Sequence, residues 1–421
     1  MRFLFTTHPG FGHLYPLVPI ARALAGRGHE VAIATSASFA PAVARSGLTP
    51  LAAGMDWLES ESYRTFPFLE GLPLDRRGSA YMTEVFAGTA GERMVKDLLA
   101  LAADWRPDVL VRTYYELGAA VVGEKLGIPH AAVGIDFFFP VHWWKTQLGP
   151  RLAYLRSLAG LAPHPAFDML HRHLFLSLVP PSYQFQLQGL PSVVEFIQPE
   201  SADAEPGADL PGWLDELADR PLVHLTLGTV FNRSEAGVFR AVIAGLAGEP
   251  VNLLVTTGDN VDPDRLGTLP GNVRAVRYLP QSQLAPRCAV VINHGGFGTL
   301  MASFASGVPV VVIPMAGALH GLRCLALRLG QVLRQPGCFD QPFAGMVPEL
   351  TPATVRTAVR TLLEDPAYRA NVGRLQDEIL ALPGASRAAE LLVQLARQGD
   401  LTLPPAGLVG TARVVSLEGQ P

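Results

Sequence analysis

The sequence predicts an α/β fold built from two parallel-sheet domains in series. Short apolar strands alternate with helical segments in both halves of the chain, and each half contains a strand that runs into a glycine-containing turn and a helix. A polar stretch rich in Pro and Gly, residues 199–212, separates the halves. Because crossover helices join parallel strands, this alternation favours two parallel sheets.

The first half opens with a strand–turn–helix–strand unit. Residues 2–7 form a short apolar strand, residues 10–13 a glycine-containing turn, and residues 14–27 place apolar side chains on one helical face. The next strand is expected at residues 30–35. Later strands of the same sheet are expected at residues 108–111 and 131–134.

The segment from residue 135 to residue 186 has a different character. It is rich in aromatic residues and its helical periodicity is weak. We expect irregular loops and helices that cover a cleft, with most of the rings filling ordinary core.

The strand pattern restarts after residue 212. The expected strands are residues 222–227, 252–256, 273–278, 289–292 and 309–313. Residues 353–398 are expected to be helical and residues 401–421 to form a loose tail. We therefore divide the chain into an N-terminal domain (1–205), a C-terminal domain (206–385) and a terminal helix with its tail (386–421), the helix packing back on the first domain.

Composition excludes several classes of protein. Hydrophobic residues make up 49% and charged residues 17% of the chain, which suits packed domains rather than disorder. The net charge is −4 with no basic block, so nucleic-acid binding is not expected.

Cysteine usage and the N-terminus indicate a cytoplasmic protein. Cys288, Cys324 and Cys338 form neither a CxxC pair nor a zinc spacing, which fits a reducing compartment. The apolar start is too short for a signal peptide, and no apolar run is long enough to span a membrane.

The most informative motif follows the apolar run at residues 289–292. It consists of His294, Gly295, Gly296, Phe297, Gly298 and Thr299. The first N–H groups of a helix have no partner within the helix, and the helix dipole favours an anion there. Glycine lets a diphosphate approach the backbone, and histidine adds a directional donor. The motif therefore predicts a pocket for an activated, phosphate-linked molecule.

Several motifs together resemble the family 1 inverting glycosyltransferases of the GT-B fold, in particular bacterial enzymes that glycosylate macrolides and polyketides. The resemblance covers nearly the whole chain. Its specific parts are residues 10–13 with Pro16, residues 22–25 with 28–31, residues 226–229, residues 279–281, and residues 294–299 with 307–309. The resemblance implies two Rossmann-like domains that face each other across a cleft.

The resemblance implies a nucleotide sugar bound in the C-terminal domain. His294, Gly295, Gly296, Gly298 and Thr299 would surround the diphosphate. Thr229 would add a phosphate contact, and backbone near Leu279 and Gln281 would pair with the base. Gly12, in the N-terminal turn, is a further donor-binding candidate. The nucleotide sugar is a co-substrate, so no cofactor and no metal are expected.

His13 is the expected catalytic base. It lies in the loop after the first strand, where α/β sheets bind ligands. An imidazole titrates near neutrality and can take the proton of an acceptor hydroxyl, and attack opposite the leaving group inverts the anomeric centre. A carboxylate usually orients such a histidine. In many relatives it occupies the position of Thr113, so Glu116 and Asp136 are the substitutes here, Glu116 being preferred.

Three departures from the family pattern bear on the sugar donor. Ala302 replaces a glutamate that binds the ribose hydroxyls, Leu319 and His320 replace the acidic residue and glutamine that hold sugar hydroxyls, and Arg323 replaces an asparagine. An unpaired hydroxyl in a closed site costs about 1–3 kcal/mol. The changes favour a deoxysugar on dTDP, a nucleotide without the ribose 2′-hydroxyl, over UDP-glucose. UDP is left open as the nucleotide of the donor.

Other classes of function remain as alternatives. A dehydrogenase is disfavoured because the turn at Gly10 and Gly12 lacks a third glycine and the second strand does not end in an acid. A metal-dependent transferase would use Asp262 and Asp264, which are better explained as a solvated turn. A relative without turnover that binds a ligand or partner subunit, and a nucleotide-sugar epimerase of the same fold, are also left open.

The acceptor is expected to be a hydrophobic small molecule. Aromatic residues between 57 and 86 and between 137 and 185 suggest an aglycone that is large and either flat or hydrophobic. The candidate contacts are His8, Phe137 and Trp143. The sequence does not identify this aglycone. The oligomeric state is left open, a homodimer being one option.

Overall fold

The computed structural model describes residues 1–185, 190–203, 209–230, 236–315, 318–335, 345–401 and 403. The chain divides into two compact units. The first comprises residues 1–72, 76–202 and 381–421, and the second residues 73–75 and 203–380. Part of the expected linker (204–208), most of the expected tail and Cys338 lie outside the described residues.

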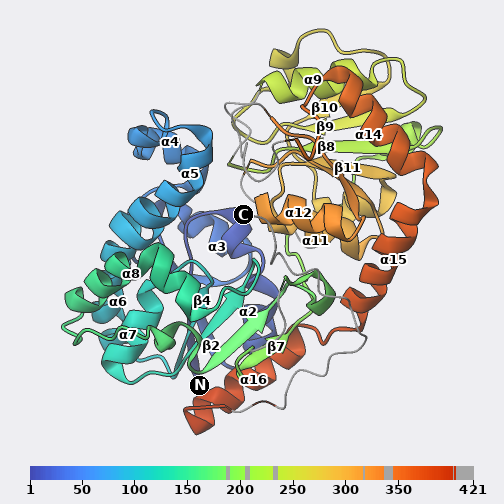
Figure 1. Cartoon of the computed structure of the whole chain (residues 1–421). Helices are drawn as coiled ribbons and strands as arrows, with labels where there is room; N and C mark the ends of the chain where they lie inside the picture. The colour runs from blue at the N-terminus through green and yellow to red at the C-terminus, as the bar shows by residue number, and fades with distance from the viewer. Residues whose placement is uncertain are drawn as a thin grey trace. The chain divides into compact units, whose positions relative to one another are not determined.

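The first unit is built on a seven-stranded sheet in the order β3-β2-β1-β4-β5-β6-β7, with every pair of neighbours parallel. Figure 1 labels β2, β4 and β7 of this sheet. Its strands are β1 (Arg2–Thr6), β2 (Glu30–Thr35), β3 (Thr49–Ala52), β4 (Val109–Thr113), β5 (His130–Gly134), β6 (Leu174–Ser177) and β7 (Val194–Phe196). Its helices are α1 (Phe11–Leu14), α2 (Val18–Ala25), α3 (Ala40–Arg45), α4 (Ser62–Thr65), α5 (Leu74–Ala80), α6 (Gly91–Trp105), α7 (Gly118–Leu126), α8 (Val141–Leu158) and α16 (Ala385–Gln398). Central strands buried on both faces account for their continuous apolar runs.

The second unit repeats the design with six parallel strands in the order β10-β9-β8-β11-β12-β13. Its strands are β8 (Leu222–Thr226), β9 (Asn252–Thr256), β10 (Val273–Val276), β11 (Val290–Asn293), β12 (Val310–Val312) and β13 (Gly330–Val332). Its helices are α9 (Ala236–Leu246), α10 (Gln281–Leu284), α11 (Phe297–Ala305), α12 (Ala318–Ala326), α14 (Pro352–Glu364) and α15 (Pro366–Ala381). The apolar faces of α9 and α14 pack over the strands to form its core.

Proline and glycine set the helix boundaries in two segments that the sequence predicts to be helical. The expected helix at residues 14–27 begins only at Val18, because Pro16 has no N–H to donate, and His13 lies in the separate short turn α1. The expected helical region 353–398 is three helices, with breaks at Pro366 and before Gly384.

The aromatic segment 135–186 is more regular than expected. It contains α8, an 18-residue helix, and the strand β6. The sequence does not indicate α8 clearly, because Pro150 lies inside the helix. One face of α8 is buried and consists of Trp144, Leu148, Leu152 and Leu155.

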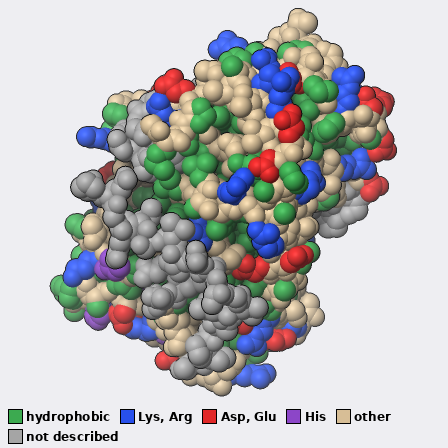
Figure 2. Space-filling view, turned by 45° about the vertical axis from the view of Figure 1, so that its right-hand side comes forward, with side chains coloured by type: hydrophobic (Ala, Val, Ile, Leu, Met, Phe, Trp, Pro, Cys, Tyr) green, Lys and Arg blue, Asp and Glu red, His purple; other side chains and the backbone are tan. Residues whose placement is uncertain are grey.

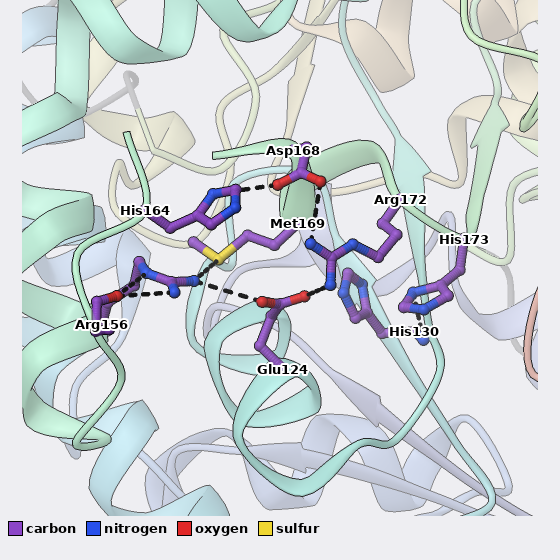
Figure 3. Close-up of polar contacts among 9 residues, drawn as sticks. Glu124, His130, Arg156, His164, Asp168, Met169, Arg172 and His173 are labelled. Atoms are coloured by element: carbon purple, nitrogen blue, oxygen red, sulfur yellow. Dashed lines mark hydrogen bonds and ion pairs between the residues drawn. The ribbon is translucent and has the colours of Figure 1, made fainter. Parts of the chain in front are cut away.

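A charged network that is buried at Glu124 and Arg156 connects α8 to α7 (Figure 3). Glu124 at the end of α7 contacts the Arg156 guanidinium at 3.5 Å and also pairs with Arg172. Arg172 in turn pairs with Asp168 at 3.0 Å. These contacts fix the end of α8 and the turn that leads into β6, so they hold the aromatic segment against the sheet.

No single helix in the described residues is long and apolar enough to cross a membrane, and the bent pair α15–α16 meets that test only when its two helices are counted together. On the face shown in Figure 2, acidic and basic side chains are interspersed rather than gathered by sign.

Candidate functional site

Each sheet has a topological switch point, where the strand order reverses direction, and the candidate residues follow the strands that flank it. In the first unit the switch point lies between β1 and β4, with Thr6 opposite Arg112. In the second it lies between β8 and β11, with Thr226 opposite Asn293. Ligands of open α/β sheets bind beyond the carboxyl ends of such strands. His13 and Glu116 follow the first pair, and Thr229 and His294 follow the second.

His13 is buried on α1, directly after the β1 loop, and is 6% exposed. Its Nε2 lies 3.5 Å from Oε1 of Glu59, a carboxylate that the sequence analysis did not single out. Its Nδ1 is buried and has no hydrogen-bond partner among the described residues. One ring nitrogen therefore faces a carboxylate, and the other has no partner among the described residues.

His8 supports this arrangement from within the same loop. Its Nε2 lies 3.0 Å from the Tyr115 carbonyl oxygen, and its ring stacks on Phe86 and meets the His13 ring edge-on at 5.5 Å. Burial, and after it the charge of His13, lowers the pKa of His8 to about 3. His8 is thus a neutral packing partner of His13 that also hydrogen-bonds a neighbouring loop, and its contact with the acceptor stays a prediction.

Glu116 does not contact His13, contrary to the expectation. Its carboxylate accepts hydrogen bonds from the Thr6 hydroxyl at 2.5 Å and from the N–H groups of Gly118 and Ala119, at the start of α7. The unpaired donors of that helix end and the Thr6 hydroxyl explain why the carboxylate lies there. Asp136, the other substitute, accepts from the Tyr115 hydroxyl at 2.5 Å. Within the described residues, the carboxylate beside His13 is that of Glu59.

Aromatic and apolar side chains form a separate cluster around this pair of histidines. The cluster comprises Trp57, Phe66, Leu69, Val85, Phe86 and Ala90, with partly buried neighbours that include Tyr81 and Tyr115. Phe86 stacks on His8 and meets His13 edge-on. An apolar acceptor reaching His13 would therefore meet apolar rings.

The two aromatic residues predicted to bind the acceptor differ in position. Phe137 is 1% exposed and packs against Tyr183 and Phe185, so it belongs to the core rather than to a binding surface. Trp143 is half-buried on α8 and stacks on Phe139 at 4.1 Å, so it remains a candidate.

In the second unit, His294 lies between glycines from two strand ends. A Cβ at Gly296 would lie 2.4 Å from the His294 Nε2, and one at Gly228, which follows β8, would lie 2.6 Å from its Cε1. Position 295 also requires glycine, because its φ of +87° lies in the left-handed region that other residues rarely adopt. Burial lowers the pKa of His294 to about 4, so the ring is neutral at pH 7.

The N-terminus of α11 is suited to an anion. Gly296 is its N-cap, no acidic residue lies in its first turn, and a Cβ at Gly298 would meet no atom within 4 Å. Thr299 is buried within that first turn, and half-buried Thr229 follows β8. Unpaired backbone N–H groups and the helix dipole attract phosphate at such a position.

In the segment expected to bind the base, backbone N–H groups already donate hydrogen bonds within the protein. Asp203 accepts hydrogen bonds from the Gln281 N–H at 2.6 Å and from Ser282, at the start of α10. The Gln281 N–H is therefore not available to a base. Leu279 is buried just before this helix.

The positions that depart from the family pattern carry side chains that are either apolar or buried. Ala302 is half-buried on α11, whereas Ser303 is buried and donates to the Thr299 carbonyl at 2.8 Å, so Ser303 does not replace the missing glutamate. On α12, Leu319 is half-buried, and His320 and Arg323 are buried. Gly12, in α1, has open space where a Cβ would lie.

The acidic pair in the second unit has a structural role. The Asp262 carboxylate accepts from the Asp264 N–H at 3.2 Å and pairs with Arg277 at 2.8 Å. Over the described part of the chain, no group of three or more His, Cys, Asp or Glu side chains is arranged to hold a metal ion.

Comparison with known proteins identifies the family. The N-terminal domain model of the erythromycin biosynthesis protein CIII-like family matches residues 22–228, and its C-terminal domain model matches residues 242–395. The chain is 30% identical to the 4'-demethylrebeccamycin synthase of Lentzea aerocolonigenes over 429 residues, which cover 93% of this chain and 98% of that protein.

Two further similarities extend over both domains. The 3-alpha-mycarosylerythronolide B desosaminyl transferase of Saccharopolyspora erythraea is 25% identical, with 94% of this chain and 98% of that protein covered. The crystal structure of the glycosyltransferase VinC in complex with dTDP superimposes with a TM-score of 0.73 at 26% identity, covering 95% of this chain and all of that one. The chain therefore belongs to the erythromycin biosynthesis protein CIII-like family and is a natural-product glycosyltransferase with the GT-B fold.

Proposed function

We propose that this enzyme transfers a deoxysugar from a dTDP donor to a hydroxyl group of a hydrophobic aglycone, with inversion at the anomeric carbon. The observation that carries the proposal is His13, a buried imidazole with one unpartnered nitrogen beneath an apolar cluster. Nδ1 takes the acceptor proton, the acceptor oxygen forms a bond to the anomeric carbon, and the bond to the diphosphate breaks. The leaving diphosphate carries away the electron pair, and the N-terminus of α11 stabilises its charge.

The identity of the donor is inferred from two positions that depart from the family pattern, Ala302 and Leu319. Ala302 supplies no acceptor for a ribose 2′-hydroxyl, and dTDP has none to satisfy. Leu319 suits a missing sugar hydroxyl or a methyl group better than a polar sugar edge. The printed names of the relatives agree, because one acts as a desosaminyl transferase and VinC was crystallised with dTDP. A cytoplasmic, metal-independent enzyme fits the proposal.

Thermal unfolding in the presence of nucleotides tests the donor. We expect dTDP and dTDP-L-rhamnose to raise the melting temperature more than UDP, GDP or UDP-glucose do, because ligand at about 100 times its Kd stabilises the folded state by about 2.7 kcal/mol. A larger shift with UDP-glucose than with dTDP-L-rhamnose would contradict the proposed donor.

Replacement of His13 tests its role as base. We expect His13→Ala to keep the dTDP-induced shift and to lose sugar transfer by a factor on the order of 100 or more. His142→Ala, at an exposed position of α8, is the matched control and should retain both properties. Transfer by His13→Ala at the wild-type rate would show that another group is the base.

A further inference from the structure

A carboxylate reaches His13 from a segment that none of the recognised motifs includes. Glu59 lies in the 3₁₀ turn η2 (Glu59–Glu61), and its Oε1 is 3.5 Å from the His13 Nε2. The distance is about 0.5 Å longer than a usual hydrogen bond, but both side chains are largely buried, at 8% and 12% exposure. Little solvent therefore screens the attraction between them.

The backbone of Glu59 is held against the loop that carries His13. The Glu59 N–H donates to the Pro9 carbonyl oxygen at 2.9 Å. The Ser62 hydroxyl contacts the Glu59 carbonyl oxygen and lies 2.6 Å from the Tyr81 hydroxyl. The turn is thus fixed on both sides, and its carboxylate has a defined position relative to His13.

The absence of a side chain at Gly10 leaves room for this carboxylate. Its φ is −144°, an extended conformation that any residue adopts, so the backbone does not require glycine. A Cβ at this position would lie 1.8 Å from the Glu59 Oε2. Glycine is needed here because the carboxylate occupies the space next to its Cα.

The remaining polar groups around His13 do not compete with Glu59. His8 meets its ring edge-on and is kept neutral by burial. The Tyr115 ring is also edge-on, and its hydroxyl donates to Asp136. The pKa of Tyr81 is raised well above its usual value, first by burial and then by the charge of Glu59. These phenols stay protonated at neutral pH, so Glu59 is the anion that His13 faces.

We propose that Glu59 is the positioning residue for His13. The inference rests on the proposed role of His13 as base. Glu59 holds the proton on Nε2, which leaves the Nδ1 lone pair for the acceptor proton. After that transfer the ring is an imidazolium, and the negative charge of Glu59 stabilises it without accepting a proton.

Removing the charge of Glu59 tests this proposal in the intact enzyme. We expect Glu59→Gln to lower kcat by a factor on the order of 100 with the KM for the nucleotide sugar unchanged, and to move the acidic limb of the pH–kcat profile to lower pH. Glu59→Asp should recover part of the loss. Glu61→Gln is the matched control, because Glu61 lies in the same turn and pairs with Arg64 instead.

Gly10→Ala displaces the same carboxylate without changing the charge of the protein. The end of the Glu59 side chain can move aside, so the fold should persist, as thermal unfolding would verify. We expect Gly10→Ala to reproduce the loss in kcat, and the double variant Gly10→Ala with Glu59→Gln to lose little more than either single variant. Losses that multiply would mean that the two residues act separately and would overturn the proposal.

A ligand-free measurement separates this proposal from the proposed function. In NMR spectra of protein with ¹⁵N-labelled histidine, the His13 ring signals, assigned by their absence in His13→Gln, should show the Nε2–H tautomer in the wild type and a changed tautomer ratio in Glu59→Gln. An unchanged tautomer ratio would overturn the role of Glu59. If instead the ratio changes while His13→Ala retains full transfer, the coupling stands and the role of His13 as base fails.

Discussion

Two of the glycines at the candidate sites, Gly10 and Gly296, make room for functional side chains rather than for unusual backbone. Gly10 and Gly296 both have negative φ, yet a Cβ at either would collide with a side chain that is central to the site. At Gly10 the obstacle is the Glu59 carboxylate, and at Gly296 it is the His294 imidazole. Both positions are therefore open to a simple experimental test, since alanine is compatible with their backbone.

The first residue-scale prediction concerns Gly296. A Cβ there would lie 2.4 Å from the His294 Nε2, so Gly296→Ala must displace the imidazole. We expect the Kd for dTDP, measured by calorimetry, to rise about tenfold or more, the cost of losing one hydrogen bond to a charged group. The control is Gly373→Ala on α15, where a Cβ meets no atom within 4 Å. An unchanged Kd would show that the position of His294 does not matter to the diphosphate.

The positions of His13 and His294 at the ends of strands could be predicted from the sequence, whereas the carboxylate beside His13 could not. His13 and His294 follow apolar strands, and that local pattern is readable without a structure. Glu59 lies far from His13 in the sequence, on an irregular turn, and no spacing links the two residues. Glu116 was preferred because it follows β4, but the N–H groups that begin α7 compete for its carboxylate.

At the scale of secondary-structure elements, most of the strands were predicted well and the helices around the acceptor region less well. The strand residues 30–35 and 252–256 agree with β2 and β9, because buried parallel strands are continuous apolar runs. The strands β3, β6, β7 and β13 were not predicted, and α8 was expected only as part of a region of irregular loops and helices. The stability of β6 and α8 comes from packing and from buried charge, such as that around Glu124, which local periodicity does not reveal.

The acid sensitivity of the fold can be predicted from this same segment. His171, just before β6, is buried, and neither of its ring nitrogens has a hydrogen-bond partner among the described residues. Burial, and after it the Arg112 guanidinium, lowers its pKa to about 3. The unfolded chain binds a proton at this residue below pH 6.5 and the folded chain does not, so folding stability is complete above pH 6.5 and falls as the pH decreases toward 3.

We therefore expect His171→Leu to make the protein less sensitive to acid. Between pH 7 and pH 5 the free energy of unfolding in urea should fall by about 2 kcal/mol less in this variant than in the wild type. His142→Gln, which removes an exposed histidine from α8, is the control and should keep the wild-type dependence on pH. Equal losses in the wild type and in His171→Leu would show that His171 becomes protonated without unfolding.

At the scale of the whole molecule, the first unit is assembled from an N-terminal part and a C-terminal part of the chain. After α15 the chain returns to this unit, and α16 packs against α2 and β4. The Glu200 carboxylate accepts from the Ala385 N–H at 2.8 Å, and Arg27 donates to the Ser386 hydroxyl at 2.7 Å. The first unit is thus built from both ends of the chain, and the last helix belongs to the core of the first domain rather than to a terminal appendage.

This arrangement predicts which unit responds when α16 is damaged. Leu392 is fully buried on α16, so Leu392→Ala should cost the first unit about 3 kcal/mol through lost burial and the cavity left behind. We expect hydrogen exchange to become faster in α2 and β4 and to stay unchanged in β8, β11 and the helices that cover them. Leu380→Ala, 56% exposed at the end of α15, is the control and should change neither unit. Faster exchange in both units would mean that they unfold as a single cooperative block, because damage confined to one core would then be transmitted to the other.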